Sequence, residues 1–497
     1  MKKKTATFVI CMLSFSGLKA QEIGIFENHI DVGAVKHTGS ASYDSDSQSY
    51  TLSGSGTNMW FGQDEMHYAY QSLQGDFIVR ARVEFVGDGV DPHRKVGWTV
   101  RNNFHADSPH VNATVHGDGL TSLQYRRTKA GDTEEVISED KGPDIIQLER
   151  RGTTYIMSTA KYGEPFTSVQ VEMDLRNEVF VGIYVCSHNP DEVEKAIYKN
   201  VRIIKPPKEG YVPYEDYIGS RLEVMNIETG ERKILSTSAH SIQAPNWTPD
   251  GKTLIYNSNG FLYKYDLVSG KASMLNTGFA NRNNNDHILS TDGSMIGISH
   301  HNDEDEGDSA IYYLPITGSD KPVKVTKNGL GASYLHGWSP NGKKMIFTGN
   351  RNGVYNIIEV NVKNGEEKHL TNTQSLDDGS EYSPDGKKIY FNSDRTGTMQ
   401  IWRMDKNGKN QEQLTFDDYN DWFPHITPDE KNMVIISYPA DIESNAHPFY
   451  KHCLLRMMPV DGGEPKIIGY LFGGQGTINV PSWSPDSKYI AFVSNSD

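Results

Sequence analysis

YSPDGKKIYF (residues 382–391) is one of six copies of a ten-residue phrase that recurs through the second half of the chain. The other copies are WTPDGKTLIY (247–256), LSTDGSMIGI (289–298), WSPNGKKMIF (338–347), ITPDEKNMVI (426–435) and WSPDSKYIAF (483–492). Each copy combines the end of one strand, a tight turn and the start of a second strand. In most copies a proline fixes the backbone angle φ and an Asp-Gly or Asn-Gly pair supports the turn. Each phrase therefore predicts a β-hairpin.

The spacing of the phrases predicts a β-propeller. Their starts lie 42, 49, 44, 44 and 57 residues apart. A period of about 40–45 residues holds four strands, and one such sheet buries both of its faces only when it packs between neighbouring copies. Six phrases therefore predict six blades, over residues 221–497.

The two ends of this repeat region complement each other. RLEVMNIETGERKIL (221–235) contains two strands around a Glu-Thr-Gly turn with no phrase before it, whereas the last phrase has no strand pair after it. We expect the first pair to complete the last blade, so that the ring closes by pairing of its first and last strands and has no free edge.

Residues 22–204 lack the phrase and show the alternation of an antiparallel sheet. In DFIVRARVEF (76–85), apolar and charged residues alternate, which predicts one face in a core and one in solvent. Several such strands between Gly, Asp and Asn turns predict a β-sandwich of the jelly-roll type. Residues 205–220, with three prolines, are expected to form a linker. Sugar-binding candidates in the sandwich, each also compatible with a core or surface role, are Trp60, Trp98, Tyr125, His105, His110 and His116.

Targeting signals and charge limit the compartment and the partners. Near the start of residues 1–20, Lys2, Lys3 and Lys4 precede an apolar run, as in a secretory signal peptide. No later stretch has the 18 or more apolar residues of a transmembrane helix. A net charge of −15 argues against nucleic acid as a partner. We expect an exported protein in which Cys186 and Cys453 remain free thiols.

The phrases also predict which residues share one face of the ring. The phrase is the turn between the two innermost strands, so residues just before it should surround the opposite mouth of the central channel. These residues are Asn246, Asp286, His287, His336, Glu381, Trp422, His425, Asn479 and Ser482. Three unusually long or glycine-rich loops reach the same mouth, namely HHNDEDEGD (300–308), YPADIESNAHPFYKH (438–452) and LFGGQGTIN (471–479). This one-sided clustering predicts a functional site.

Imidazoles and a carboxylate at this mouth suit a divalent metal or an acid/base centre. The expected ligands of one divalent ion, Mn, Zn or Ca, are His287, His336, Glu381 and His425. The expected catalytic residues are His336, Glu381, His425, His301 and His447, with His300 as a further loop candidate. The expected substrate-binding residues are Trp422, Asp286, Gln475 and Asn479. The alternative for each histidine is that it caps a strand or fills the channel.

Three resemblances extend this interpretation. The phrases, together with NSDRTGTMQIWRMDKNGKNQEQLT (392–415), resemble the repeat of TolB-type periplasmic β-propellers, which implies a Gram-negative envelope location. LQGDFIVRARVEF (73–85) and VHGDGLTSLQYR (115–126) resemble concanavalin A-like modules of secreted glycan-active proteins. Propellers of the oligogalacturonate lyase family are similar in outline and use channel-mouth histidines around a metal.

The sequence therefore favours a carbohydrate-processing protein, a glycan lyase or hydrolase, that is periplasmic or secreted. Its partner would be an oligosaccharide or polysaccharide held at the propeller mouth. Two alternatives stay open: a non-catalytic envelope scaffold that receives a protein partner at the same mouth, and a glycan-binding protein without chemistry.

Overall fold

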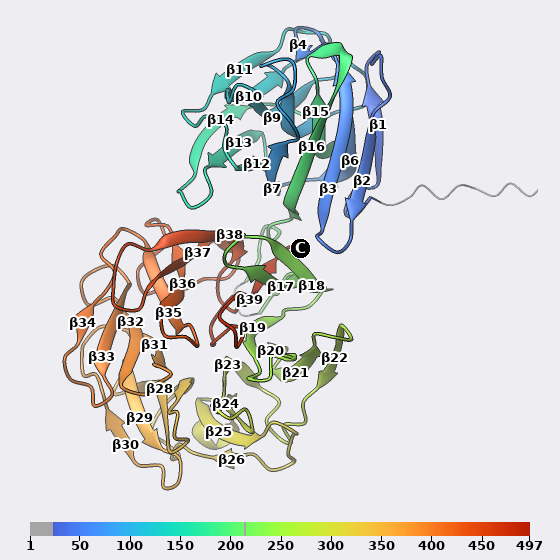
Figure 1. Cartoon of the computed structure of the whole chain (residues 1–497). Helices are drawn as coiled ribbons and strands as arrows, with labels where there is room; N and C mark the ends of the chain where they lie inside the picture. Colours follow the sequence, from blue (N-terminus) through green and yellow to red (C-terminus); the bar gives the residue numbers. More distant parts are fainter. Residues whose placement is uncertain (1–22, 213–214) are drawn as a thin grey trace, which may run out of the picture.

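The six phrases fold as hairpins between the two innermost strands of the propeller blades. The computed structural model describes residues 23–212 and 215–497, and the predicted signal peptide (1–20) lies outside these residues. The described chain forms a β-sandwich followed by a β-propeller (Figure 1). The predicted all-β class, the sandwich and the six blades are confirmed.

Five blades are four-stranded antiparallel sheets whose strands follow one another from the channel outward. In order, they are β19 (Gln243–Trp247), β20 (Thr253–Ser258), β21 (Phe261–Asp266) and β22 (Lys271–Met274); β23 (Asn283–Leu289), β24 (Met295–His301), β25 (Ser309–Pro315) and β26 (Val323–Lys324); β27 (Ser333–Trp338), β28 (Lys344–Arg351), β29 (Val354–Asn361) and β30 (Glu367–His369); β31 (Asp377–Tyr382), β32 (Lys388–Ser393), β33 (Gln400–Asp405) and β34 (Glu412–Gln413); and β35 (Asn420–Ile426), β36 (Asn432–Tyr438), β37 (Lys451–Pro459) and β38 (Lys466–Gly473). One 3-10 helix, η1 (Asp303–Asp305), lies in a loop of the second blade.

The sixth blade joins the two ends of the propeller, as the unmatched strand pair predicts. Its order is β18 (Arg232–Ser238), β17 (Ser220–Asn226) and β39 (Tyr489–Asn495), and a bridge between Trp483 and Ile490 adds the innermost segment. The register of β17 and β39 runs without a break from Ser220 opposite Asn495 to Asn226 opposite Tyr489. The ring therefore closes through backbone hydrogen bonds and leaves neither strand as an edge.

The apolar end of each phrase supplies the packing between blades. The last residue of every copy, for example Phe347, Phe391 or Phe492, is buried. Phe391 packs with Ile346 and Ile357 of the preceding blade. Because each sheet covers its neighbour, a separate apolar cluster lies between successive blades around the ring.

The sandwich consists of two seven-stranded antiparallel sheets. The first has the order β1 (Asn28–Val32), β6 (Met66–Gln74), β15 (Glu178–Cys186), β8 (Lys95–Arg101), β9 (His110–His116), β10 (Thr121–Arg126) and β11 (Glu134–Ile137). The second has the order β14 (Thr167–Glu172), β13 (Thr154–Ala160), β12 (Ile145–Arg151), β7 (Phe77–Phe85), β16 (Asn189–Ile204), β3 (Ser49–Gly56) and β2 (Ser40–Asp44). A short hairpin of β4 (Met59–Trp60) and β5 (Gln63–Asp64) lies beside them.

One prediction for β7 is wrong in part. Phe77, Val79 and Ala81 enter the sandwich core as the alternation predicts. Arg80, assigned from sequence to a solvent face, is buried and donates to the backbone carbonyl of Tyr470 in β38 of the propeller. The second face of this sheet is therefore the face on which the propeller docks.

Several further contacts join the two domains. The Tyr162 hydroxyl donates to the Ile468 carbonyl at 2.8 Å, and the Tyr470 hydroxyl donates to the Glu164 carbonyl at 2.5 Å. The sandwich thus lies against β37 and β38 and against the closing blade (Figure 1). Among the described residues, no helix is long and apolar enough to cross a membrane. Cys186 and Cys453 are free and buried, as predicted.

Candidate functional site

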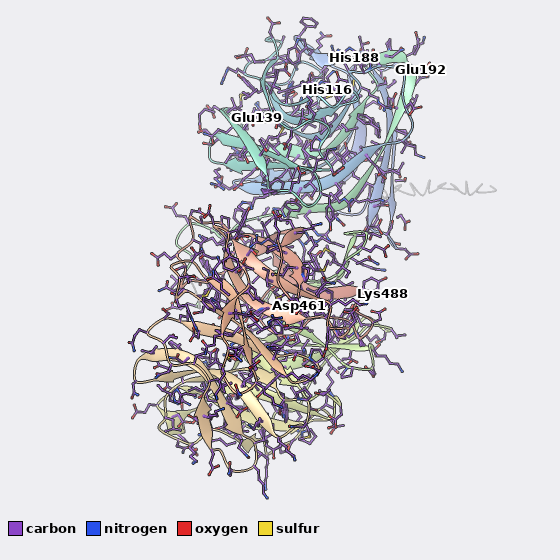
Figure 2. The ribbon with its side chains drawn as sticks, turned by 60° about the vertical axis from the view of Figure 1, so that its left-hand side comes forward. His116, Glu139, His188, Glu192, Asp461 and Lys488 are labelled. Carbon is purple, nitrogen blue, oxygen red and sulfur yellow. The ribbon has the colours of Figure 1, made fainter. Side chains whose placement is uncertain are left out.

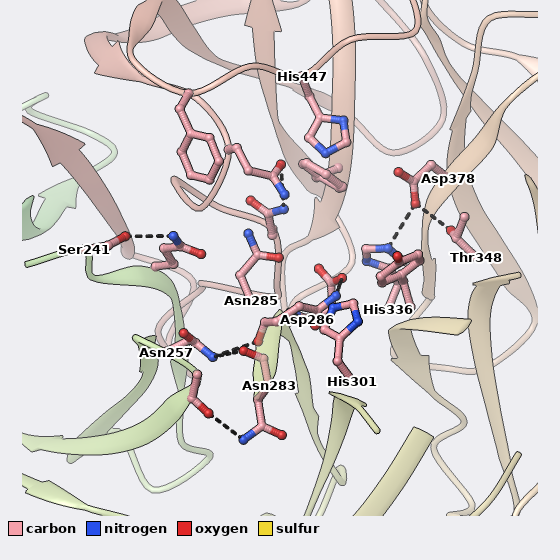
Figure 3. A pocket seen from close by; sticks show the side chains of 18 of the residues that line it. Ser241, Asn257, Asn283, Asn285, Asp286, His301, His336, Thr348, Asp378 and His447 are labelled. Atoms are coloured by element: carbon pink, nitrogen blue, oxygen red, sulfur yellow. Dashed lines mark hydrogen bonds and ion pairs between the residues drawn. The ribbon is translucent and has the colours of Figure 1, made fainter. Parts of the chain in front are cut away.

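A cavity of about 720 Å³ opens where the innermost strands begin, at the mouth opposite the phrase turns (Figure 3). All six blades contribute to its wall. Six of the residues singled out from sequence line it, namely Asp286, His301, His336, His447, Gln475 and Asn479. The cavity is therefore the place where the polar side chains of the predicted mouth meet.

A repeated β-bulge aims these side chains into the channel. In each of the five four-stranded blades, the register between the two innermost strands shifts near the start of the first strand, for instance between Asn283 and His287 in β23 and between Leu335 and Gly337 in β27. A bulge inserts an extra residue into the strand, so the side chains beside it no longer point alternately to the two faces of the sheet. In β31 the bulge uses Gly379 at φ 62°, a conformation that glycine adopts without strain.

An ion pair lies at the centre of the cavity wall. His336 Nε2 and Asp378 Oδ1 are 3.0 Å apart, and the Thr348 hydroxyl donates to Asp378 at 2.5 Å (Figure 3). Burial alone would lower the pKa of His336, but the carboxylates of Asp286 and Asp378 raise it to about 8. Burial alone would raise the pKa of Asp378. The attraction of His336 outweighs burial, so the pKa of Asp378 lies below its ordinary value. The imidazolium form of His336 therefore prevails at neutral pH.

Asp286 is the second carboxylate of this centre and differs from Asp378 in its environment. The Asn284 side-chain amide donates to its Oδ2 at 2.7 Å, and within the described residues no donor is paired with Oδ1. Burial raises the pKa of Asp286 to about 6, Asp378 acts in the same direction and His336 opposes both. Asp286 thus combines an available oxygen with a pKa close to neutrality.

His447 enters the cavity from the long loop between β36 and β37. Its ring packs against Trp422 and Phe423, with centroids 4.4 and 5.4 Å away. Burial lowers the pKa of His447 to about 4, so the ring is neutral at pH 7. Its Nδ1 is buried, and none of the described residues offers it a hydrogen-bond partner. The neutral ring of His447 therefore forms part of the cavity wall.

The predicted metal ligands do not come together. Within residues 23–212 and 215–497, no three His, Cys, Asp or Glu side chains are grouped so that they could hold a metal ion. His287 is fully buried and lies against the backbone carbonyls of Asn285 and Ile255, because the bulge turns Asp286 rather than its neighbour into the channel. Glu381 and His425 pair with each other, with Oε2 and Nδ1 2.7 Å apart, and are absent from the cavity wall. The four side chains therefore do not form the predicted set.

Two other candidates also occupy packing positions. Trp422 was expected to offer a flat face to a sugar, but it is fully buried and supports His447. His300 packs between Phe279 and Tyr312, with ring centroids 6.0 and 5.8 Å away. His301 does line the cavity, and its Nδ1 lies 2.9 Å from the Gly307 carbonyl oxygen.

The sandwich candidates lie away from this cavity. Trp98, Tyr125 and His110 are buried within the sandwich. His116 lies near His188 at the end remote from the propeller (Figure 2). Burial, reinforced by Lys95, lowers the pKa of His116 to about 4. None of the six sugar-binding candidates of the sandwich contributes to the cavity wall.

Sequence reasoning missed much of the wall. The cavity is rich in amides that it did not single out, among them Gln243, Asn257, Asn259, Asn283, Asn284 and Asn285. The run NRNNND (281–286) was an available signal, because three successive asparagines end at Asp286 in a predicted mouth position. Asp378 was missed because it lies four residues before the phrase that begins at Tyr382. The bulge in β31 places Asp378, rather than Glu381 directly before the phrase, at the cavity wall.

Comparisons with known proteins agree on the propeller. The family model described as a TolB beta propeller domain matches residues 305–447. A curated but uncharacterised protein of Agrobacterium fabrum is 43% identical over 276 residues, which cover 55% of this chain and 92% of that protein. A solved TolB-type structure from Agrobacterium tumefaciens has 42% identity and a TM-score of 0.54, covering 57% of this chain and all of its own. An oligogalacturonate lyase in complex with manganese is far more distant, at 13% identity and a TM-score of 0.34, covering 54% of this chain and 73% of its own.

Proposed function

Because the chain belongs to the family of TolB-type β-propeller proteins, we propose that it acts through the mouth of its ring, where it binds an oligosaccharide and processes it as a lyase or hydrolase. The observation that carries this proposal is the 720 Å³ cavity in which Asp286 and Asp378 flank His336 among amide and aromatic side chains. We also propose that the protein is exported, in keeping with the signal peptide predicted for residues 1–20.

The cavity wall suits a polyhydroxylated ligand. Amide side chains both donate and accept hydrogen bonds, as sugar hydroxyl groups require. Tyr334, Tyr355, Phe423 and Phe449 add ring surfaces that can cover the apolar face of a sugar. The volume is within the range of about 300–1,000 Å³ that is usual for small-molecule sites.

The chemistry that we propose is proton transfer by Asp286. In its ionised form, the available Oδ1 can accept a proton from a substrate carbon or from an attacking water, and in its protonated form it can return one to the leaving oxygen. His336, held as an imidazolium by Asp378, stabilises negative charge that develops beside it. His447 supplies a neutral ring in the cavity wall for positioning the substrate.

The test is incubation of the purified protein with neutral, amino and acidic oligosaccharides, followed by product analysis and calorimetry. The control residue is Asp461, an exposed carboxylate of the propeller (Figure 2). Turnover that disappears in Asp286→Asn and persists in Asp461→Asn supports the proposal. Saturable binding without product indicates a glycan-binding protein. Capture of an envelope protein at the same mouth, without any sugar binding, indicates a scaffold.

We predict a bell-shaped pH profile for turnover. Activity should rise as Asp286 ionises near pH 6 and fall as His336 loses its proton near pH 8. The measurement is kcat/KM from pH 4.5 to 9.5 at constant ionic strength. In Asp286→Asn, any residual activity should lack the acidic limb, and its basic limb should move to lower pH because His336 loses a neighbouring carboxylate. An acidic limb that persists unchanged would contradict the role of Asp286.

For a hydrolase, we also predict a preference for neutral or amino sugars over uronates; a lyase would instead require a uronate, whose carboxyl group acidifies the carbon-bound proton that is removed. The central group combines two carboxylates with one imidazolium, and the Arg282 guanidinium at the rim already pairs with Asp303 at 2.7 Å. A uronate carboxylate would therefore meet net negative charge. In competition between neutral and uronate oligosaccharides of equal length, the protein should bind the neutral ligand more tightly. Asp286→Asn should reduce the difference in affinity between the two ligands. Tighter binding of the uronate by the wild-type protein would contradict this charge argument.

A further inference from the structure

The junction between the sandwich and the propeller holds more buried positive charge than negative charge. Four arginines gather there: Arg80, Arg202 and Arg232 are buried, and Arg221 is half-buried. Glu223, the carboxylate at their centre, is fully buried and pairs with Arg202 at 2.6 Å and with Arg232 at 2.8 Å. Both of these arginines belong to the same ion-pair network, whereas Arg80 instead donates to the Gln147 side chain and to the Tyr470 carbonyl.

Arg221 is left without a carboxylate partner in the described part of the chain. Its Nη2 donates to the Ile203 carbonyl at 2.6 Å. Its Nη1 is buried, and no described residue accepts a hydrogen bond from it. Glu223 cannot fill this role, because its oxygens already accept from Arg202, Arg232 and Ser494. Burial, reinforced by Arg202, lowers the pKa of Arg221 to about 10, so the guanidinium stays charged at neutral pH.

A second cavity, of about 270 Å³, lies at this position. Its wall combines sandwich residues from β6 and β16 with propeller residues from β17 and β18. Arg202, Lys205 and Arg221 line it together with apolar side chains such as Leu73 and Ile203. The carboxylate in the wall, Asp497, lies 3.5 Å from Lys208. The cavity is partly open to solvent and presents cationic groups beside apolar side chains.

A partly buried cation without a counter-ion is destabilising, and a bound oxyanion would offset that cost. Guanidinium groups match the planar oxygen pairs of carboxylates and phosphates particularly well. We propose that this junction cavity binds a small oxyanion, a carboxylate or a phosphate, which is neutralised jointly by Arg221 and Lys205 in the cavity wall. The proposal is independent of the chemistry at the propeller mouth.

The experiment uses the full chain, dialysed into a chloride buffer without oxyanions. Inorganic phosphate or acetate is then titrated at constant ionic strength while thermal unfolding is followed. We expect Tm to rise with at least one of these probes and to saturate. A response to acetate alone identifies a carboxylate site, and a response to phosphate alone identifies a phosphate site. Titration calorimetry of the folded wild-type protein gives an independent binding constant.

Two variants separate specific binding from general stabilisation by salt. Arg221→Met should raise Tm in the anion-free buffer, because it removes a partly buried charge without a carboxylate partner, and should weaken oxyanion binding at least tenfold. Arg94→Met is the matched control, since Arg94 is buried but pairs with Glu194 at 2.8 Å. It should lower Tm and keep the response to the oxyanion. Absence of saturable binding by calorimetry, or an unchanged response in Arg221→Met, would overturn the proposal.

Discussion

Replacing Asp286 by asparagine is expected to lower turnover by about 10²–10⁴-fold, the usual contribution of a positioned acid or base. The substitution keeps the shape of the side chain and an oxygen that can accept from Asn284. It removes the ability of this side chain to exchange a proton with a substrate. Binding should change much less than kcat, because the amide and aromatic walls remain in place.

Asp286→Asn should not destabilise the fold at neutral pH. A carboxylate whose folded pKa is raised to about 6 opposes folding when it is ionised, so its contribution is favourable at low pH and is lost as pH rises through 6. The neutral amide avoids this loss. Urea unfolding at pH 5 and pH 7.5 should therefore show a smaller difference between the two pH values in the variant than in the wild type.

Steady-state kinetics and a melting curve on the same preparation separate the two effects. Asp461→Asn serves as the control, because Asp461 is an exposed propeller carboxylate that pairs with Arg403. Full activity in Asp286→Asn would exclude this residue as the acid or base. A loss of both activity and cooperative unfolding would assign Asp286 a structural role.

Replacing Glu223 by glutamine is expected to have the largest effect on stability, about 3–5 kcal/mol, the usual cost of leaving buried charges unpaired. Glu223 is fully buried and accepts from Arg202 of the sandwich and from Arg232 of the propeller. Glutamine keeps one acceptor oxygen but removes the charge. The guanidinium groups around it would then lack their shared counter-ion.

The stability that Glu223 provides should also depend on pH. Burial opposes ionisation of Glu223, but Arg202 and Arg232 together hold its pKa well below the ordinary value of 4.5. The stabilisation is thus complete above that ordinary value and is lost as pH falls toward the lower folded pKa. Chemical unfolding between pH 3 and pH 7 measures it. Parallel curves for the wild-type protein and Glu223→Gln over this range would contradict the assignment.

The architecture could be predicted from sequence because its signals are local and repeated. Each phrase carries its own turn chemistry, so the hairpins follow without knowledge of the rest of the chain. The closure followed from counting strands at the two ends, and the pairing of β17 with β39 confirms it. The docking face of β7 could not be predicted, because an alternating strand does not reveal whether its charged side faces water or a second domain.

The site was harder to predict because it depends on backbone irregularity. Asp286 and His287 are adjacent, and only the bulge in β23 decides that the carboxylate faces the cavity while the imidazole lies beneath it. The same device selects Asp378 over Glu381 in β31. The distance of a residue from the nearest phrase therefore predicts the residues at the channel mouth to within a few positions. The extra residue of a bulge then changes which of these side chains faces the cavity.

The strand that closes the ring also anchors the sandwich. β17 pairs with β39 along its whole length, and its Glu223 accepts from Arg202 on the last strand of the sandwich. Separation of the two domains would leave Glu223 without this partner, and opening of the ring would move the strand on which the sandwich rests. Separation of the domains and opening of the ring are thus expected to be coupled. The docked sandwich stabilises the pairing of β17 with β39 that closes the propeller.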